Sequence, residues 1–204
     1  MLLGTQMVTK GHDFPKVATV GVLNADGSLF LDDYRASERT FAMLTQVIGR
    51  AGRADVPGCA IIQTHNPTNE VLSLAATQDY ERFYEGEIRL RKALCFPPFC
   101  DIAVITLSSA DESQLGLMTT QMYERIVNHI RKDFSDIPLM LYGPFEASIY
   151  RVQNICRMRF VLKCRLNKRT RAFLSDLMTE FAKSTPAKGR KRVTVSVDLN
   201  PSTV

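Results

Sequence analysis

The sequence lacks the features of membrane, secreted and disulfide-bonded proteins. It has no apolar run near the roughly 20 residues that a membrane span needs. Its start, MLLGTQMVTKGHD, has no apolar signal region and no cleavage site. The five cysteines are an odd number, widely spaced and without a CxxC pair, which favours reduced thiols over disulfides or a zinc site. We therefore expect a cytoplasmic protein without a membrane segment and without a bound metal.

The composition is that of an ordinary globular protein with an uneven distribution of charge. Apolar residues make up 45% and charged residues 23% of the 204 positions, which excludes a disordered chain, a collagen-like repeat or a coiled-coil rod. Residues 139–204 carry 13 Lys and Arg against 4 Asp and Glu. This basic part favours an anionic partner such as nucleic acid, and a well-solvated surface is the alternative.

Alternating strand and helix patterns in residues 1–68 predict part of a parallel α/β layer. The β-branched run Val17–Leu23 and the apolar run Cys59–Gln63 are typical of buried strands. Between them, Ser37 is the expected N-cap of a helix that ends near 49–52. Because a buried strand needs neighbours on both sides, we expect an uncovered apolar edge through which the chain can self-associate.

Residues 69–95 and 96–204 have the patterns of a helical connector and of a second, smaller domain. Apolar residues recur at helical spacing through the connector, and Pro97-Pro98 cannot continue a helix, so we place the domain boundary there. The remainder follows the order β-α-β-β-α-β, which is that of a split βαβ α+β fold. Its second strand is short, and residues 144–154 are an alternative further strand.

Two clusters in the first 55 residues contain glycine, polar and charged residues that the packing of a core does not require. The first, Gly4–Pro15, places glycines around Thr, Lys and Asp, a composition that lets backbone amides approach a phosphate closely. The second, Gln46–Arg53, holds Arg50 and Arg53 three residues apart at the end of the predicted helix. Guanidinium groups bind phosphate oxygens in a fork, so a shared anion would offset the repulsion between them. The alternative is that these arginines pair with carboxylates, those of Asp32 or Asp33.

These clusters and several further segments resemble the primosomal protein N′ family, the bacterial replication-restart DNA helicases of superfamily 2. The two clusters are similar to helicase motifs V and VI. The other similar segments are Asn24–Gly27, Asp32–Phe41, Gln63–Pro67, Phe96–Phe99, Gly143-Pro144 and Val197–Pro201. The resemblance spans nearly the whole chain. It implies an α/β protein in which a partial RecA-like helicase lobe 2 precedes a small α+β C-terminal domain.

For the N-terminal part, the resemblance implies an ATP site that the other motor lobe completes. Arg50 and Arg53 would be arginine fingers on the γ-phosphate, and Gln46 a further catalytic residue. The implied nucleotide-binding residues are Gly11, Asp13, Gly49, Arg50 and Arg53, and the implied DNA contacts of this part are Thr5 and Lys10. ATP and Mg²⁺ would be cofactors of the full-length protein. The family's phosphate loop, DExH motif and zinc ligands are absent from this sequence, so the chain by itself should not hydrolyse ATP.

A basic face is predicted on the strand at residues 155–165, where apolar and basic side chains alternate. We expect Arg157, Arg159 and Lys163 to face outward together and to contact DNA phosphates with little base preference. A second basic group extends the predicted DNA contacts, namely Lys188, Arg190, Lys191 and Arg192. The alternative is a solvated strand face followed by a solvated loop.

Two functions therefore compete. The first is part of an ATP-dependent 3′→5′ DNA helicase that restarts stalled replication forks and assembles the primosome. Its partners, by resemblance, would be forked or single-stranded DNA, single-strand-binding protein and primosome proteins. The second is a non-enzymatic module that binds DNA or single-strand-binding protein. Arg50 and Arg53 favour the first function, because a pure binding module has no use for arginine fingers.

Overall fold

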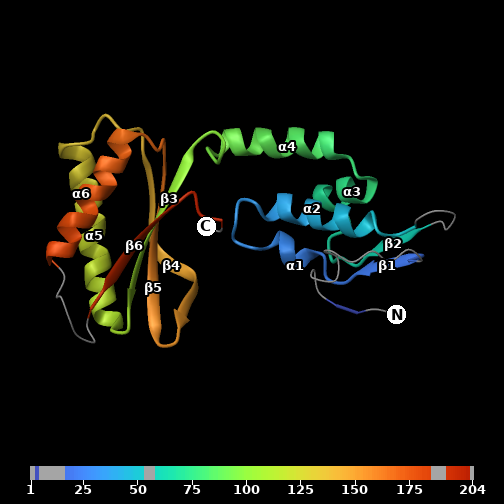
Figure 1. Ribbon diagram of the computed structural model, residues 1–204, viewed down its shortest axis with the longest axis horizontal. Helices are drawn as coiled ribbons and strands as arrows, with labels where there is room; N and C mark the ends of the chain where they lie inside the picture. The colour runs from blue at the N-terminus through green and yellow to red at the C-terminus, as the bar shows by residue number, and fades with distance from the viewer. Residues whose placement is uncertain (1–2, 5–16, 53–57, 185–191, 203–204) are drawn as a thin grey trace. The chain divides into compact units, whose positions relative to one another are not determined.

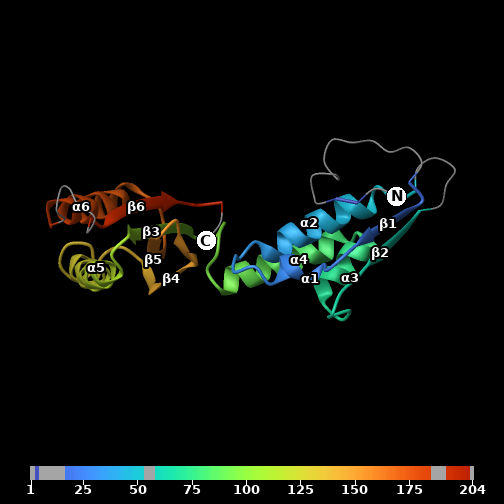
Figure 2. The same ribbon diagram turned by 90° about the horizontal axis from the view of Figure 1, so that it is seen from below.

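The computed structural model describes residues 3–4, 17–52, 58–184 and 192–202. The chain divides into two compact units, unit 1 (Met1–Leu90) and unit 2 (Arg91–Val204) (Figures 1 and 2). The predicted boundary at Pro97-Pro98 lies a short distance inside unit 2. None of the helices in the described ranges has the length and apolar character needed to cross a membrane.

Unit 1 is built on a pair of parallel strands. In chain order it contains β1 (Thr19–Val22), α1 (Asp26–Leu29), α2 (Ala36–Ile48), β2 (Cys59–Ile62), α3 (Glu70–Thr77) and most of α4 (Tyr80–Ala93). Thr19 lies opposite Cys59 and Val22 opposite Ile62 in a parallel register, as the two strand patterns predict. Within the described residues, no further strand joins this sheet.

Two helix boundaries differ from the sequence prediction. α2 begins at Ala36 with Arg35 at its N-cap, so Ser37 lies in the first turn and the prediction that it caps the helix is wrong. The Asp33 carboxylate accepts the Arg35 backbone N–H at 2.9 Å and so orders the chain before the helix. The connector, predicted as one helix, is two helices, because Gln78 has a φ of 56° and ends α3. A left-handed residue cannot continue a right-handed helix.

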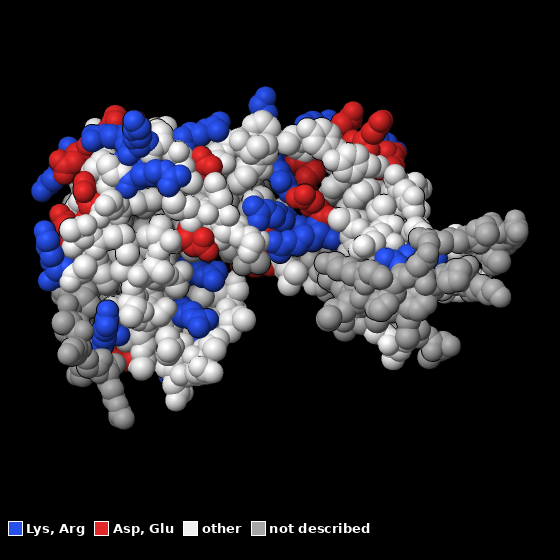
Figure 3. Space-filling model, viewed as in Figure 1, with Lys and Arg blue, Asp and Glu red and all other residues white. Residues whose placement is uncertain are grey.

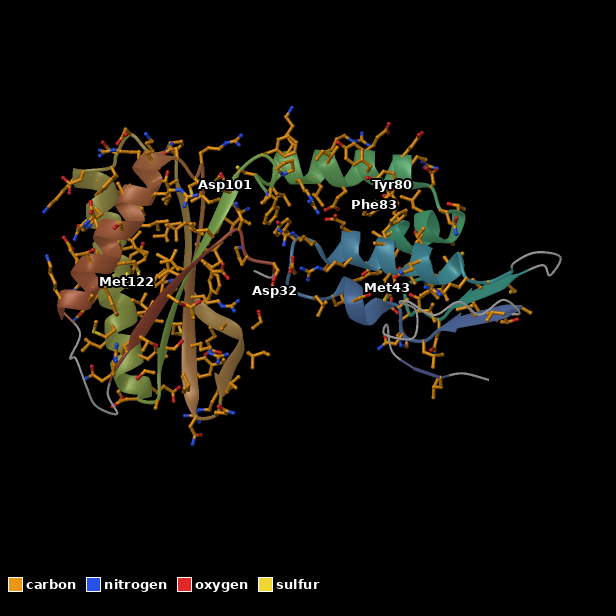
Figure 4. The ribbon with its side chains drawn as sticks, viewed as in Figure 1. Asp32, Met43, Tyr80, Phe83, Asp101 and Met122 are labelled. Atoms are coloured by element: carbon orange, nitrogen blue, oxygen red, sulfur yellow. The ribbon has the colours of Figure 1, made fainter. Side chains whose placement is uncertain are left out.

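Aromatic packing joins α4 to α2 inside unit 1. The rings of Phe41 and Phe83 stack with their centroids 4.2 Å apart and an angle of 10° between their planes. Tyr80 adds a tilted contact to Phe41 with a centroid distance of 6.2 Å. Figure 4 shows Tyr80 and Phe83 on the side of α4 that faces α2. The first turns of α4 are therefore anchored to the core of unit 1.

A buried carboxylate closes the end of β2 against α1. The Asp26 side chain is 4% exposed, and its two oxygens accept the Thr64 hydroxyl at 2.6 Å and the His65 backbone N–H at 2.8 Å. These hydrogen bonds, above all the one from Thr64, hold the pKa of Asp26 below its ordinary value. The ionised carboxylate thus fixes the chain where it leaves the parallel strand pair.

Apolar side chains remain uncovered around this strand pair. Leu23, directly after β1, is 71% exposed, and Ile61 in β2 is 59% exposed. Both strands alternate between exposed and half-buried residues and contain no fully buried one, so the prediction that they are buried strands is wrong. Large apolar side chains this accessible are the kind of surface through which proteins associate. Self-association through this region stays a prediction.

Unit 2 has the predicted β-α-β-β-α-β order. Its elements are β3 (Asp101–Ser109), α5 (Glu112–Lys132), β4 (Met140–Val152), β5 (Ile155–Cys164), α6 (Lys168–Ser184) and β6 (Thr194–Leu199). The strands form one sheet in the order β4-β5-β3-β6, and all neighbours are antiparallel. α5 and α6 cover one face of this sheet (Figures 1 and 2). The mixed α/β class predicted from the sequence is confirmed.

The core of unit 2 lies between the sheet and its two helices. Phe160 of β5, Met122 of α5 and Phe173 of α6 are all fully buried there. Figure 4 shows Met122 in this helical layer. At the end of the sheet where the chain enters, the Asp101 carboxylate accepts the Leu166 N–H at 2.9 Å and the Asn200 side-chain amide at 2.9 Å. The core and this closure make unit 2 a complete packed layer.

We predict that Asp26 makes the stability of unit 1 depend on pH. Because its folded pKa is below the ordinary value of 3.8, ionised Asp26 stabilises the fold above that pH, and this contribution is lost as the pH falls through the folded pKa. Asp26→Asn should therefore flatten the loss of stability between about pH 5 and pH 2. Urea unfolding at several pH values measures this. The exposed Asp32→Asn variant is the control, and equal curves for the two variants would contradict the prediction.

Candidate functional site

The sheet of unit 2 presents one face that no helix covers. We call this surface the open face and define it by the residues that strand register places opposite the helical layer. They include Tyr142 and Phe145 on β4, Arg157, Arg159 and Val161 on β5, Val104, Thr106 and Ser108 on β3, and Thr194, Ser196 and the exposed Asp198 on β6. The alternate residues of β5, such as Phe160, belong to the core. The period of two in a strand therefore separates the basic side chains from the apolar core, as the sequence predicts.

A bulge in β4 brings two aromatic rings to the open face. Tyr142 pairs with Val161 and Phe145 with Arg159, so three steps along β4 match two steps along β5. Without this extra residue, Phe145 would point to the opposite side of the sheet from Tyr142. Gly143 permits the bulge, because its φ is 105° and a Cβ there would lie 2.7 Å from the Arg159 carbonyl oxygen. Tyr142 and Phe145 are 43% and 41% exposed.

Arg157 and Arg159 lie next to these rings on the central strand β5. Both are half-buried, and they are two residues apart on one face, which corresponds to about 6.5 to 7 Å. The Arg159 Nε is buried and has no hydrogen-bond partner within the described ranges. Figure 3 shows Lys and Arg atoms among uncharged atoms on the strand side of unit 2. The open face therefore combines guanidinium groups with accessible aromatic carbon.

Lys163 lies on the same face of β5 as Arg157 and Arg159 but is buried there, so the prediction that it faces outward with them is wrong. Its side chain is 8% exposed, and Nζ donates to the Leu94 carbonyl at 2.8 Å. The ammonium also lies 3.5 Å from the centroid of the Phe96 ring. The chain that leads from α4 into β3 folds over this end of the sheet. Lys163 is therefore an internal anchor for that segment, satisfied by a carbonyl and an aromatic face.

The remaining predicted basic contacts are only partly described. Arg192 is exposed and lies just before β6. Lys188, Arg190 and Lys191 lie outside the described residues. The same holds for residues predicted from the N-terminal clusters, namely Thr5, Lys10, Gly11, Asp13 and Arg53. Their assignments stay predictions.

The end of α2 carries the described part of the second candidate site. Gln46 is exposed in the last turn, Gly49 is the C-cap, and Arg50 follows half-buried. The chain then bends at Gly52, whose φ is 71° and whose N–H donates to the Val17 carbonyl at 3.0 Å. This hydrogen bond holds the end of the arginine segment beside the start of β1. Glycine adopts this left-handed conformation at little cost, so the chain can turn there.

The alternative that Arg50 pairs with Asp32 or Asp33 is wrong. Both carboxylates precede α2, whereas Arg50 follows it, and a helix of 13 residues is about 20 Å long. Figure 4 shows Asp32 near the N-terminal end of α2. Asp33 instead pairs with Arg39 at 3.1 Å in the first turns of the helix. Neither of these two carboxylates therefore holds Arg50 in its position.

Two of the residues that matter most on the open face, Tyr142 and Phe145, are absent from the sequence-based prediction. Simple alternation cannot place both on one face, because they are three residues apart. The signal available in the sequence is Gly143-Pro144 between them, a pair that interrupts regular pairing. The predicted short strand and the alternative strand at 144–154 are one long strand, β4, which continues through this bulge and through a second register shift between Glu146 and Arg151.

The described residues contain no group of three or more His, Cys, Asp or Glu side chains placed to hold a metal ion. The cysteines described are all reduced. Cys100 and Cys164 are buried, and burial raises the pKa of each thiol to about 11. These thiols are packing residues and offer no reactive thiolate.

Together, these features define a class: a split βαβ domain with a basic and aromatic open face, preceded by part of a parallel α/β layer. The family described as "Primosomal protein N C-terminal domain" matches residues 92–202, which are nearly all of unit 2. The chain belongs to this primosomal protein N family.

Similar curated proteins cover both units. The replication restart protein PriA of Bacillus subtilis is 35% identical over 201 residues, which are 98% of this chain and 24% of that protein. The replication restart protein PriA of Chlamydia muridarum is 35% identical over 204 residues, 100% of this chain and 26% of that protein. That of Treponema pallidum is 50% identical over 99 residues, 48% of this chain and 15% of that protein. The chain thus spans about a quarter or less of the length of these relatives.

We predict that Lys163 stabilises unit 2. Lys163→Met keeps most of the side-chain volume but leaves the Leu94 carbonyl without its donor, which should lower the free energy of unfolding by about 1–3 kcal/mol. Arg157→Met, on the same strand and the same face, should change it by about 0.5 kcal/mol or less. Urea unfolding followed by circular dichroism measures both. An equal effect of the two substitutions would show that Lys163 is not the anchor.

Proposed function

We propose that the chain is the C-terminal part of an ATP-dependent 3′→5′ DNA helicase that restarts stalled replication forks and assembles the primosome. The names of the relatives and the family membership support a role in replication restart. In this proposal, unit 2 holds DNA, and unit 1 contributes arginine fingers to an ATP site that the rest of a longer protein completes.

The observation that carries the DNA-binding part is the open face of unit 2. Arg157 and Arg159 stand on one face of β5, beside the hydroxyl groups of Thr106 and Ser108 on β3. Guanidinium and hydroxyl groups are the side chains that most often contact the nucleic-acid backbone. The excess of Lys and Arg over residues 139–204 adds long-range attraction for a polyanion.

The observation that supports the ATP-site part is the position of the segment after α2. Arg50 lies beyond the helix end, and the Gly52 hydrogen bond to Val17 holds the segment at the parallel strand pair. Gln46 lies one turn before Arg50, so both can approach one ligand from the same side. Arg50, with Gly49, Arg53, Gly11 and Asp13, would bind the triphosphate, and Gln46 would be a further catalytic residue. Bound Mg²⁺ would neutralise the phosphate charge through ligands supplied by another part of the longer protein.

A non-enzymatic module is the second candidate, and unit 2 supports it. Unit 2 has its own core and sheet, so it can bind DNA whether or not the motor is present. Single-strand-binding protein and other primosome proteins are further proposed partners of the longer protein. The two candidates differ in whether Arg50 and Arg53 influence ATP turnover.

For the DNA contact, we predict the loss of two phosphate interactions in Arg157→Ala/Arg159→Ala. The slope of log K against log salt concentration should become shallower by about 1.4 to 1.8. Each phosphate contact contributes about 0.7 to 0.9 to the magnitude of that slope. Fluorescence anisotropy with labelled forked DNA measures the slope. Arg169→Ala is the matched control, since Arg169 pairs with Asp136 on the helical side. An unchanged slope in the double variant would make the open face an ordinary solvated surface.

For the ATP site, we predict that the chain alone hydrolyses no ATP above background, with or without DNA, because it lacks a phosphate loop. In the full-length protein, Arg53→Ala should lower kcat by about 10³-fold or more and leave DNA affinity nearly unchanged. Arg39→Ala is the control, because Arg39 pairs with Asp33 at the other end of α2. Normal kcat in the Arg53 variant would assign that residue to structure.

A further inference from the structure

We propose that the open face of unit 2 binds single-stranded DNA by stacking unpaired bases on Tyr142 and Phe145. This inference rests on the proposed DNA-binding function and goes beyond it. Phosphate contacts alone would accept single strands and duplexes alike, whereas base stacking requires bases that are free of a duplex.

The first argument is the geometry of the two rings. Both lie on the edge strand β4, on the same side of the sheet, and each keeps about two fifths of its surface exposed. Their partners on β5, Val161 and Arg159, are two residues apart, which corresponds to about 6.5 to 7 Å along the strand. That spacing suits successive bases of an extended single strand. In a duplex the bases are already stacked and paired, so they cannot lie on these rings.

The second argument is that exposed rings here are costly without a ligand. Regular alternation would have sent Phe145 to the core side, and only the bulge at Gly143-Pro144 brings it out. Tyr142, before the bulge, lies on the open face by regular alternation. Large aromatic side chains usually gain stability by burial. Two of them placed side by side in solvent, next to cations, fit a partner with flat π-faces and negative charge.

The third argument is the order of chemical groups across the sheet. The register gives the row Phe145, Arg159, Thr106, Ser196, which runs from an aromatic ring through a guanidinium to two hydroxyl groups. The next row contains Arg157, Ser108 and Thr194. Neither of these two rows contains an acidic residue, and the row of Tyr142 and Val161 carries its one acidic residue, Asp198, on β6, at the far edge of the sheet from β4. A single strand lying along β4 and β5 can therefore place its bases on the rings and its phosphates on the arginines.

Binding experiments with the whole chain test the inference. The probes are fluorescein-labelled oligo-dT and a blunt hairpin duplex with the same number of phosphates. Tyr142→Ala/Phe145→Ala should weaken oligo-dT binding by about fivefold or more, with an unchanged salt slope and little effect on the duplex. Tyr123→Ala is the matched control, because Tyr123 is 42% exposed but lies on α5. If the double variant is less stable than the parent chain, Phe145→Leu takes its place. It keeps an apolar side chain but removes the π-system, so it should also weaken oligo-dT binding.

A fluorescence experiment reports stacking directly. The chain has no tryptophan, so Phe145→Trp introduces a single indole on the open face. Oligo-dT should quench the emission of this indole, and the quenching should saturate at the same oligo-dT concentration as the anisotropy. The hairpin should not quench it. Tyr123→Trp supplies the control for non-specific quenching.

The outcomes separate this inference from the proposed function. Loss of oligo-dT affinity in the aromatic variants, together with quenching of Trp at position 145, supports stacking. Unchanged oligo-dT affinity in the aromatic variants, with loss of affinity in Arg157→Ala/Arg159→Ala, overturns the stacking inference and leaves the DNA-binding proposal intact. Equal loss of single-strand and duplex binding in the aromatic variants also overturns it. Unchanged binding in both sets of variants overturns the DNA-binding proposal itself.

Discussion

One constraint determines the role of almost every residue in unit 2: its four-stranded sheet is covered by helices on a single face. Since side chains alternate along a strand, each position of β5 goes either to the core or to the open face. Phe160 and Leu162 lie fully buried under α5 and α6, whereas Arg159 and Val161, which alternate with them in sequence, lie on the other side. The same alternation that builds the hydrophobic core therefore also assembles the candidate DNA surface. A substitution on one face can change binding without removing core packing.

Lys163 is an exception, because it lies on the open face and is nevertheless buried. It occupies an open-face position, yet the segment from Leu94 to Phe96 folds over it and turns a surface cation into a buried one. Burial of an ammonium is costly unless its donors are satisfied. The Leu94 carbonyl and the Phe96 ring satisfy it, and Tyr142 lies nearby with its ring centroid 5.2 Å from Nζ. The connector is thereby tied to the sheet at this end of the open face.

The sequence predicts those features that depend on local pattern. Alternation in β5, the helical seams of α5 and α6, and the two strand runs of unit 1 are all local, and the structure contains them. Features that depend on distant or unusual backbone geometry are missed. Gln78 splits the connector by adopting a left-handed conformation that its residue type does not signal. The bulge at Gly143 and the cover over Lys163 need contacts between segments far apart in sequence, which periodicity cannot reveal.

The two candidate sites differ in how much of their chemistry this chain holds. The open face is built wholly from unit 2, whose described strands form one sheet over a closed core, so the proposed DNA contacts all come from this chain. The arginine segment after α2 is different, because arginine fingers, its proposed role, act on a nucleotide that other groups must hold. Its neighbouring strands β1 and β2 also leave Leu23 and Ile61 exposed. Within the described residues of unit 1, apolar side chains of the strand pair therefore remain uncovered, and the proposed role of the arginine segment requires a nucleotide held by other groups.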